Sequence, residues 1–226
     1  FMKDNSVLKL GGLFAIALGI AKLLAAILYF VVPPEQRLDV PGAVLLPSVA
    51  QDSTMLFAIF WLESLAGILG LAVVPAVRSL VLSMNEGWVR WTSTLAAFGF
   101  AISAMGYLTT IGRLPTIAAA FVKGDPSTQA ALAATWKSSP DLFGLWGYGA
   151  IGLWILIVSL NALRGTALPK TLNYVGILLA VDALLVPIAQ LMKSGSLITI
   201  IVGASAILVP VWYIWLGLVL RKANAS

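Results

Sequence analysis

Six stretches of this chain each run for about 20 residues with almost no charge, and this feature limits what the chain can fold into. They cover residues 7–32, 54–77, 88–111, 142–163, 171–192 and 197–220. A helix of about 20 apolar residues is long enough to cross the hydrocarbon core of a bilayer. Lipid offers no hydrogen bonds, so backbone groups must pair within each segment, as they do in a helix. We therefore expect one all-α domain over residues 1–226, a polytopic integral membrane bundle of six transmembrane helices.

The composition supports a membrane protein and removes several kinds of chemistry. Hydrophobic residues make up 60% of the 226 residues and charged residues only 10%, against about 25% in an ordinary soluble domain. The chain contains no cysteine and no histidine. It therefore lacks thiolate ligands, the commonest metal ligand and the favoured general base near neutral pH. We expect no metal site, no catalytic residues and no enzymatic activity. The cofactor question stays open, because contact with a lipid, a pigment or a quinone needs neither residue type.

The lysines and arginines of the loops predict an orientation in the membrane, because cytoplasmic loops are enriched in them. With six spans, one side carries both termini and eight of these cations, and the other side carries five. The eight cations on the side of the termini are Lys3, Lys9, Arg78, Arg90, Arg164, Lys170, Arg221 and Lys222. The five on the other side are Arg37, Arg113, Lys123, Lys137 and Lys193. We expect both termini to be cytoplasmic. No loop contains a cluster of basic residues with interleaved aromatic residues, so the expected partners are lipids and other membrane subunits rather than nucleic acid.

Two long connections, residues 33–53 and 113–141, fall on the side opposite the termini. In the second, Asp125 followed by Pro126 is typical of a helix start, and Leu132 and Trp136 lie one turn apart. This pattern predicts a short helix lying on the membrane surface. A lid over a binding site is the alternative interpretation, because long loops often carry function.

Three charged residues lie inside the spans: Lys22, Glu63 and Asp182. Counted from the outer ends of their spans, all three lie about 14–15 Å deep, close to the midplane. We expect one cluster of a cation and two carboxylates. A lysine and a carboxylate can pair merely because isolated charges are costly in lipid, or the cluster can be an ion, proton or solute site. Pro187 removes the helical hydrogen bond to Ala183, beside Asp182, and predicts a kink there.

Small residues recur on two faces of the first span. Gly11, Ala15 and Gly19 share one face, and Ala17, Ala21 and Ala25 share another. Small residues let helices approach closely in lipid, where no hydrophobic effect drives helix association. These faces predict close packing within the bundle, with one of them as an alternative docking surface for a partner. Two tryptophans deep in their spans, Trp61 and Trp154, are expected to pack between helices.

Four short motifs carry a resemblance to a known family. They are Gly11-Gly12-Leu13-Phe14, Leu168-Pro169-Lys170, Tyr174-Val175-Gly176-Ile177 and Trp212-Tyr213-Ile214-Trp215-Leu216-Gly217. With these motifs the chain resembles the bacterial six-span membrane proteins known as domain of unknown function 4386. The resemblance implies a bacterial inner membrane protein and supplies no activity or catalytic residues. In size and in the small-residue face of its first span, the chain is also similar to the substrate-binding subunits of energy-coupling-factor vitamin transporters.

Two functions follow from these patterns. The first is a non-enzymatic accessory or scaffold subunit that packs against a larger membrane complex through its small-residue faces. The second is a small carrier or substrate-binding transporter subunit whose site is the level of Lys22, Glu63 and Asp182. The sequence predicts neither a substrate nor an oligomeric state.

Overall fold

The computed structural model describes residues 5–37, 40–82, 85–136, 144–166 and 168–223, and all its regular structure is helical. Six of its helical segments are long enough and apolar enough to cross a membrane, as predicted. They are α1 (Asn5–Val31), α3 (Thr54–Val81), α4 (Glu86–Lys123), the π-helix η3 (Leu145–Ala150) running into α6 (Ile151–Leu163), α7 (Lys170–Leu191) and α8 (Gly195–Lys222). The chain is thus a multi-pass helical membrane protein.

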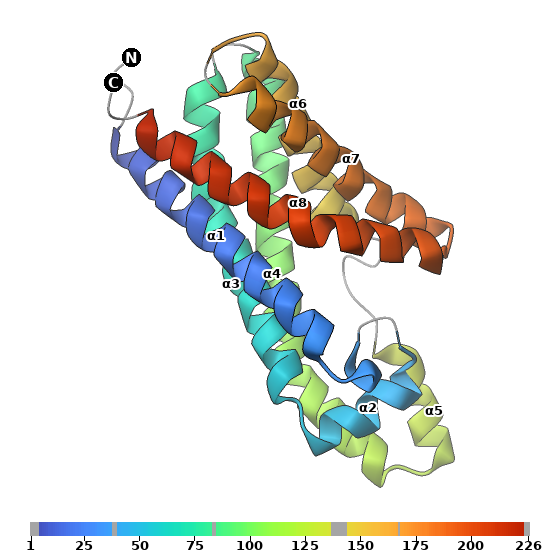
Figure 1. Cartoon of the computed structure of the whole chain (residues 1–226). Helices are drawn as coiled ribbons and strands as arrows, with labels where there is room; N and C mark the ends of the chain where they lie inside the picture. The colour runs from blue at the N-terminus through green and yellow to red at the C-terminus, as the bar shows by residue number, and fades with distance from the viewer. Residues whose placement is uncertain (1–4, 38–39, 83–84, 137–143, 167, 224–226) are drawn as a thin grey trace.

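The six segments form a ring in chain order (Figure 1). Each packs against the next, from α1 through α3, α4, α6 and α7 to α8, and α8 returns to α1. Three aromatic side chains meet inside this ring. Trp154 of α6 makes edge-to-face contacts with Phe100 of α4 and with Trp212 of α8. Trp154 is fully buried, as predicted, whereas Trp61 is 57% exposed on the outside of α3, so the expectation for Trp61 was wrong.

The small residues of α1 pack within the chain. A Cβ atom on Gly11 would lie 2.1 Å from the Cβ of Ala76 on α3, and one on Gly19 would lie 2.6 Å from Cγ1 of Ile214 on α8. Ala15, Ala21 and Ala25 are also buried, and Ala17 is half-buried. Helix α1 thus approaches two neighbours closely, as the small residues predicted. Ala21 and Ala25 are covered by the chain itself and are not available to a partner.

Helix α4 is 38 residues long, about 57 Å, and so extends well beyond a hydrocarbon core of about 30 Å. The expected connection 113–141 therefore begins as a continuation of α4, with Pro115 inside the helix. The short helix predicted in this connection is present as α5 (Pro126–Thr135). The Asp125 carboxylate caps it by accepting a hydrogen bond from the Thr128 amide. The last residues of the connection, 137–141, and the start of the predicted fourth span, 142–143, lie outside the described residues.

The far end of α4 belongs to a second, smaller lobe (Figure 1). Here α5 packs against α4 and against α2 (Gly42–Gln51), a helix that the sequence analysis did not expect in the connection 33–53. The short helix η1 (Pro34–Gln36) completes the lobe. Its core contains Leu45 and Leu46 of α2, Phe60 of α3, and Leu114 and Phe121 of α4.

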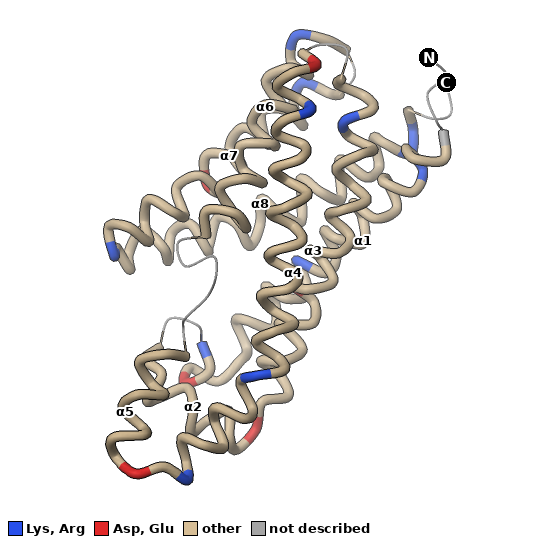
Figure 2. The backbone as a smooth tube through the Cα atoms, turned by 180° about the vertical axis from the view of Figure 1, so that it is seen from behind, with Lys and Arg blue, Asp and Glu red and all other residues tan. Residues whose placement is uncertain are grey.

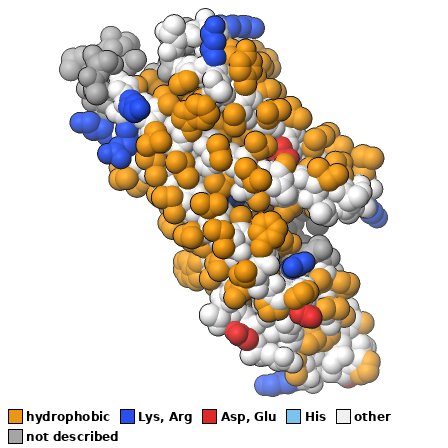
Figure 3. Space-filling view, in the orientation of Figure 1, with side chains coloured by type: hydrophobic (Ala, Val, Ile, Leu, Met, Phe, Trp, Pro, Cys, Tyr) orange, Lys and Arg blue, Asp and Glu red, His pale blue; other side chains and the backbone are white. Residues whose placement is uncertain are grey.

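Charge is concentrated at the two ends of the molecule (Figure 2). The space-filling view shows lysine and arginine side chains at the end that holds the termini, and hydrophobic side chains over most of the face below them (Figure 3). Acidic and basic side chains reappear on the smaller lobe (Figure 3). This distribution is the one expected of a helical bundle in lipid with a polar lobe on one side.

Candidate functional site

The structure brings together two of the three charged residues predicted inside the spans. Nζ of Lys22 on α1 lies 2.5 Å from Oε2 of Glu63 on α3, and the two form a hydrogen-bonded ion pair. Their side chains are 28% and 16% exposed, respectively. The pair is therefore covered by protein on most sides but not sealed.

Asp182 does not join this pair. Its carboxylate Oδ2 accepts a hydrogen bond from the Ser205 hydroxyl, which joins α7 to α8. Pro187 lies within α7, which continues to Leu191, so the proline leaves the helix unbroken. The expected cluster of one cation and two carboxylates is thus divided between two places in the bundle.

Two tyrosines join the Lys22–Glu63 pair instead. Tyr107 of α4 and Tyr148 of η3 share a side-chain hydrogen bond. Tyr107 lies near enough to Glu63, and Tyr148 near enough to Lys22, for a charge on either phenol to influence that neighbour. We call these four residues the charged cluster. Neither tyrosine was predicted from the sequence, although each is a hydroxyl-bearing residue within a predicted span and could have been considered on that ground.

Tyr148 lies in the π-helix η3, with which the chain enters its span. The Gly144 carbonyl accepts hydrogen bonds from the amides of Tyr148 and Gly149, at 3.0 and 3.1 Å. Gly144 has φ +66°, in the left-handed region that favours glycine. A Cβ atom at Gly144 would lie 2.9 Å from Cδ2 of Tyr148. Local π-helices are rare and occur often at functional sites.

Close packing of α3 against α4 positions two other members of the cluster. Ser64, the neighbour of Glu63, donates a hydrogen bond to the Ala104 carbonyl of α4 at 3.0 Å. Three residues further along α3, a Cβ atom on Gly67 would lie 2.9 Å from the Phe100 carbonyl oxygen. Close approach of α3 to α4 therefore places Glu63 near Tyr107.

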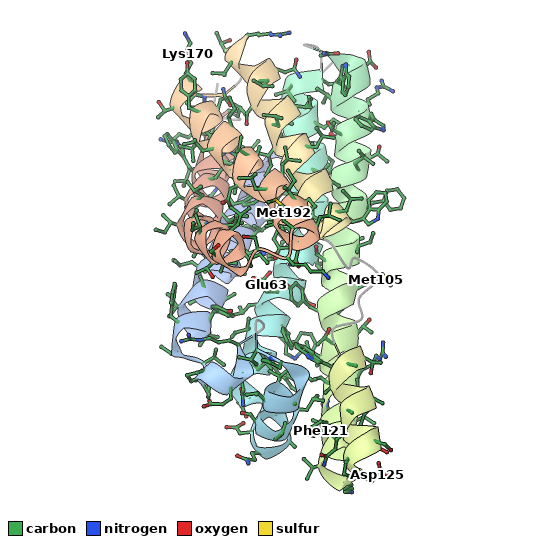
Figure 4. All side chains as sticks on the ribbon, turned by 90° about the vertical axis from the view of Figure 1, so that its right-hand side faces the viewer. Glu63, Met105, Phe121, Asp125, Lys170 and Met192 are labelled. Carbon is green, nitrogen blue, oxygen red and sulfur yellow. The ribbon has the colours of Figure 1, made fainter. Side chains whose placement is uncertain are left out.

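The charged cluster lies in the half of the bundle nearer the smaller lobe. Lys22 is nine residues before the end of α1 at Val31, and Glu63 is nine residues after the start of α3 at Thr54, so both lie about 13 Å from those ends. Figure 4 shows Glu63 at about the height of Met105 and below Met192, between Lys170 at one end and Asp125 at the other. The cluster therefore lies near the level at which α7 ends and the smaller lobe begins.

This arrangement supplies both signs of charge and two hydroxyl groups from four helical segments. A buried ion pair is stabilised only if its charges are well compensated. A charged solute could bind to Lys22 or Glu63 in place of the other residue, and the tyrosine hydroxyls could donate or accept hydrogen bonds.

A separate groove of about 380 Å³ lies between α1 and α8, and Leu23, Ile207, Val211 and Leu218 are among its lining residues. Its apolar lining would accommodate a lipid or quinone tail, a contact that the sequence left open, but its lining residues offer no charged group to a head group.

Comparison of the chain with protein-family models, with curated proteins and with solved structures finds no match. The resemblance to the family of unknown function named above therefore remains a prediction. The fold establishes the class, a multi-pass membrane bundle with six candidate spans.

Proposed function

We propose that the protein is a small, non-enzymatic membrane carrier or solute-binding subunit, and that the charged cluster is its site. The observation that carries this proposal is the partly exposed Lys22–Glu63 pair, with tyrosines from two further helical segments beside it. The cluster offers a cation, an anion and hydroxyl groups together, which favours a small solute that carries both an amine and a carboxylate.

The face of α1 formed by Ala17, Ala21 and Ala25 gives little support to the accessory-subunit alternative. This alternative relied on close approach of a partner helix to α1, and Ala21 and Ala25 are covered by the chain's own helices. An accessory role would have to use another apolar face. We therefore place the carrier or binding role first. We keep the proposal of a bacterial inner membrane location with cytoplasmic termini, which rests on the family resemblance and on the distribution of Lys and Arg.

The proposal can be tested with the purified protein in liposomes. Pools of radiolabelled amino acids would be screened for binding and uptake, using wild-type protein, the Lys22→Met/Glu63→Gln double variant and a Lys9→Met control. Lys9→Met removes a cation from the same helix but leaves the charged cluster intact. We expect a zwitterionic pool to bind to wild type and to Lys9→Met, and to fail with the double variant while its melting temperature stays near that of wild type. Equal binding by a well-folded double variant would contradict the proposal.

A further inference from the structure

Asp182 and Ser205 form a second polar site, separate from the charged cluster. The Ser205 hydroxyl of α8 donates to the Asp182 carboxylate of α7. Asp182 is 8% exposed and Ser205 is half-buried, so protein covers most of the pair. Both residues lie inside segments long and apolar enough to cross a membrane.

The two residues occupy equivalent places in a short repeated pattern. Asp182 begins the sequence DALLVP and Ser205 begins SAILVP, so a proline follows each polar residue at the same offset. Proline has no amide hydrogen, and the carbonyl four residues before it loses its helical donor. Pro187 leaves the Ala183 carbonyl without this donor, and Pro210 does the same for the Ala206 carbonyl. The residue after Asp182 and the residue after Ser205 therefore each have a backbone carbonyl that can accept a further hydrogen bond.

Among the residues that the structure describes, the elements packed against α7 provide no counter-charge for Asp182. Within its range, α6 contains no acidic or basic residue, and the ionisable group of η3, Tyr148, interacts with Tyr107 and Lys22. On α8 the ionisable residues are Tyr213, two turns beyond Ser205, and Arg221 and Lys222 at the end of the helix. Lys193 lies three turns beyond Asp182 along the chain. No described residue of these elements would therefore balance the charge of an ionised Asp182 at membrane depth.

We propose that Asp182 is a proton-binding site within the membrane, with Ser205 as the hydroxyl that adapts to its two states. When the carboxylate is ionised, Ser205 donates to it. When the carboxylate takes up a proton from water and becomes a neutral acid, Ser205 turns and accepts, or the acid donates to a carbonyl. Ca²⁺ and Mg²⁺ take about six oxygen ligands or more, so a carboxylate and one hydroxyl suit a proton better.

The test uses dicyclohexylcarbodiimide, an apolar reagent that adds to protonated carboxyl groups in lipid. Protein in vesicles would be treated from about pH 5 to about pH 9, and modification of Asp182 measured by mass spectrometry of its peptide. We expect modification to fall with rising pH and to be absent in Asp182→Asn. Ser205→Ala removes a donor that stabilises the ionised form, so the midpoint should rise by about one pH unit, a tenfold gain in proton affinity. Ser205→Thr should keep the wild-type midpoint, as should Ser196→Ala, a control on the same helix.

Three results would overturn the proposal. One is the absence of modification at Asp182 at every pH, and another is an unchanged midpoint in Ser205→Ala. The third is suppression of modification by sodium ions at constant pH, which would indicate a metal cation in place of the proton. The test does not involve solute binding, so its outcome is independent of the role proposed for the charged cluster.

Discussion

Lys22 and Glu63 are 41 residues apart in the chain, yet they form a direct ion pair between α1 and α3. Each charge depends on the other, because an isolated charge at membrane depth is costly. The consequences of breaking the pair distinguish a structural from a functional role.

Removing one partner should be worse than removing both. Lys22→Met and Glu63→Gln should each lower stability by about 3 kcal/mol, because each leaves an unpaired ionisable or polar group, whereas the double variant should recover most of the loss. The measurement is thermal unfolding of purified variants in detergent. Additive losses in the double variant would show that the two residues are not coupled.

Gly144→Ala should destabilise the protein by about 1–2 kcal/mol, because alanine is strained at the positive φ of this residue and its Cβ would press on Tyr148. Gly106→Ala is the matched control. A Cβ there meets no atom within 4 Å, and the residue is inside α4, so the change should stabilise by about 0.5–1 kcal/mol. Melting curves of both variants check the prediction, and equal effects in the two would contradict it.

Ala21→Leu should destabilise the isolated protein by about 1–3 kcal/mol, because the alanine is 3% exposed and a larger side chain would overfill the contact between helices. Ala17→Leu should cost less, since Ala17 is only half-buried. The comparison is made on the purified chain without partners. If Ala21→Leu were as stable as wild type, this surface would have room for a docking helix after all.

The helix cap at Asp125 should be sensitive to acid. Hydrogen bonds from the Thr128 amide and the Ser127 hydroxyl hold the pKa of Asp125 below its ordinary range. A lowered pKa means that the cap contributes stability above the unfolded-state pKa, and that this contribution is lost as pH falls through the folded-state pKa. Hydrogen exchange at Thr128, corrected for intrinsic rate, should therefore lose protection below about pH 4. In Asp125→Asn, which can cap without ionising, protection should not depend on pH in this range.

The orientation predicts that residue 127 and residue 226 lie on opposite sides of the membrane. The chain has no cysteine, so single cysteines introduced at Ser127 and at Ser226 can be labelled without background. An impermeant thiol reagent applied to intact cells should label the first and leave the second unlabelled. The reverse pattern would mean that the termini are outside the cell.

The sequence by itself determined the features that depend on neighbouring residues in the chain. Each span is a run of apolar residues whose helix satisfies its own backbone, so the six spans could be found without knowing their neighbours. The cap of α5 is equally local, because Asp125 bonds the amide of Thr128, three residues away. The extension of α4 beyond residue 111 was missed, since Arg113 and Pro115 mark the end of the apolar run without ending the helix.

Tertiary structure alone decided which side of each span faces inward. In a soluble protein the polar face of a helix marks its outside, but in lipid both faces are apolar, and the sequence gives little signal of direction. Trp61 and Trp154 had the same expected role, yet one faces outward and the other is at the centre of the ring. For the same reason, the similar depth of the three charged residues did not show that Lys22 pairs with Glu63 while Asp182 bonds to Ser205. Partners in a membrane bundle depend on the rotation of each helix and on its neighbours, and both are set by packing across the whole ring.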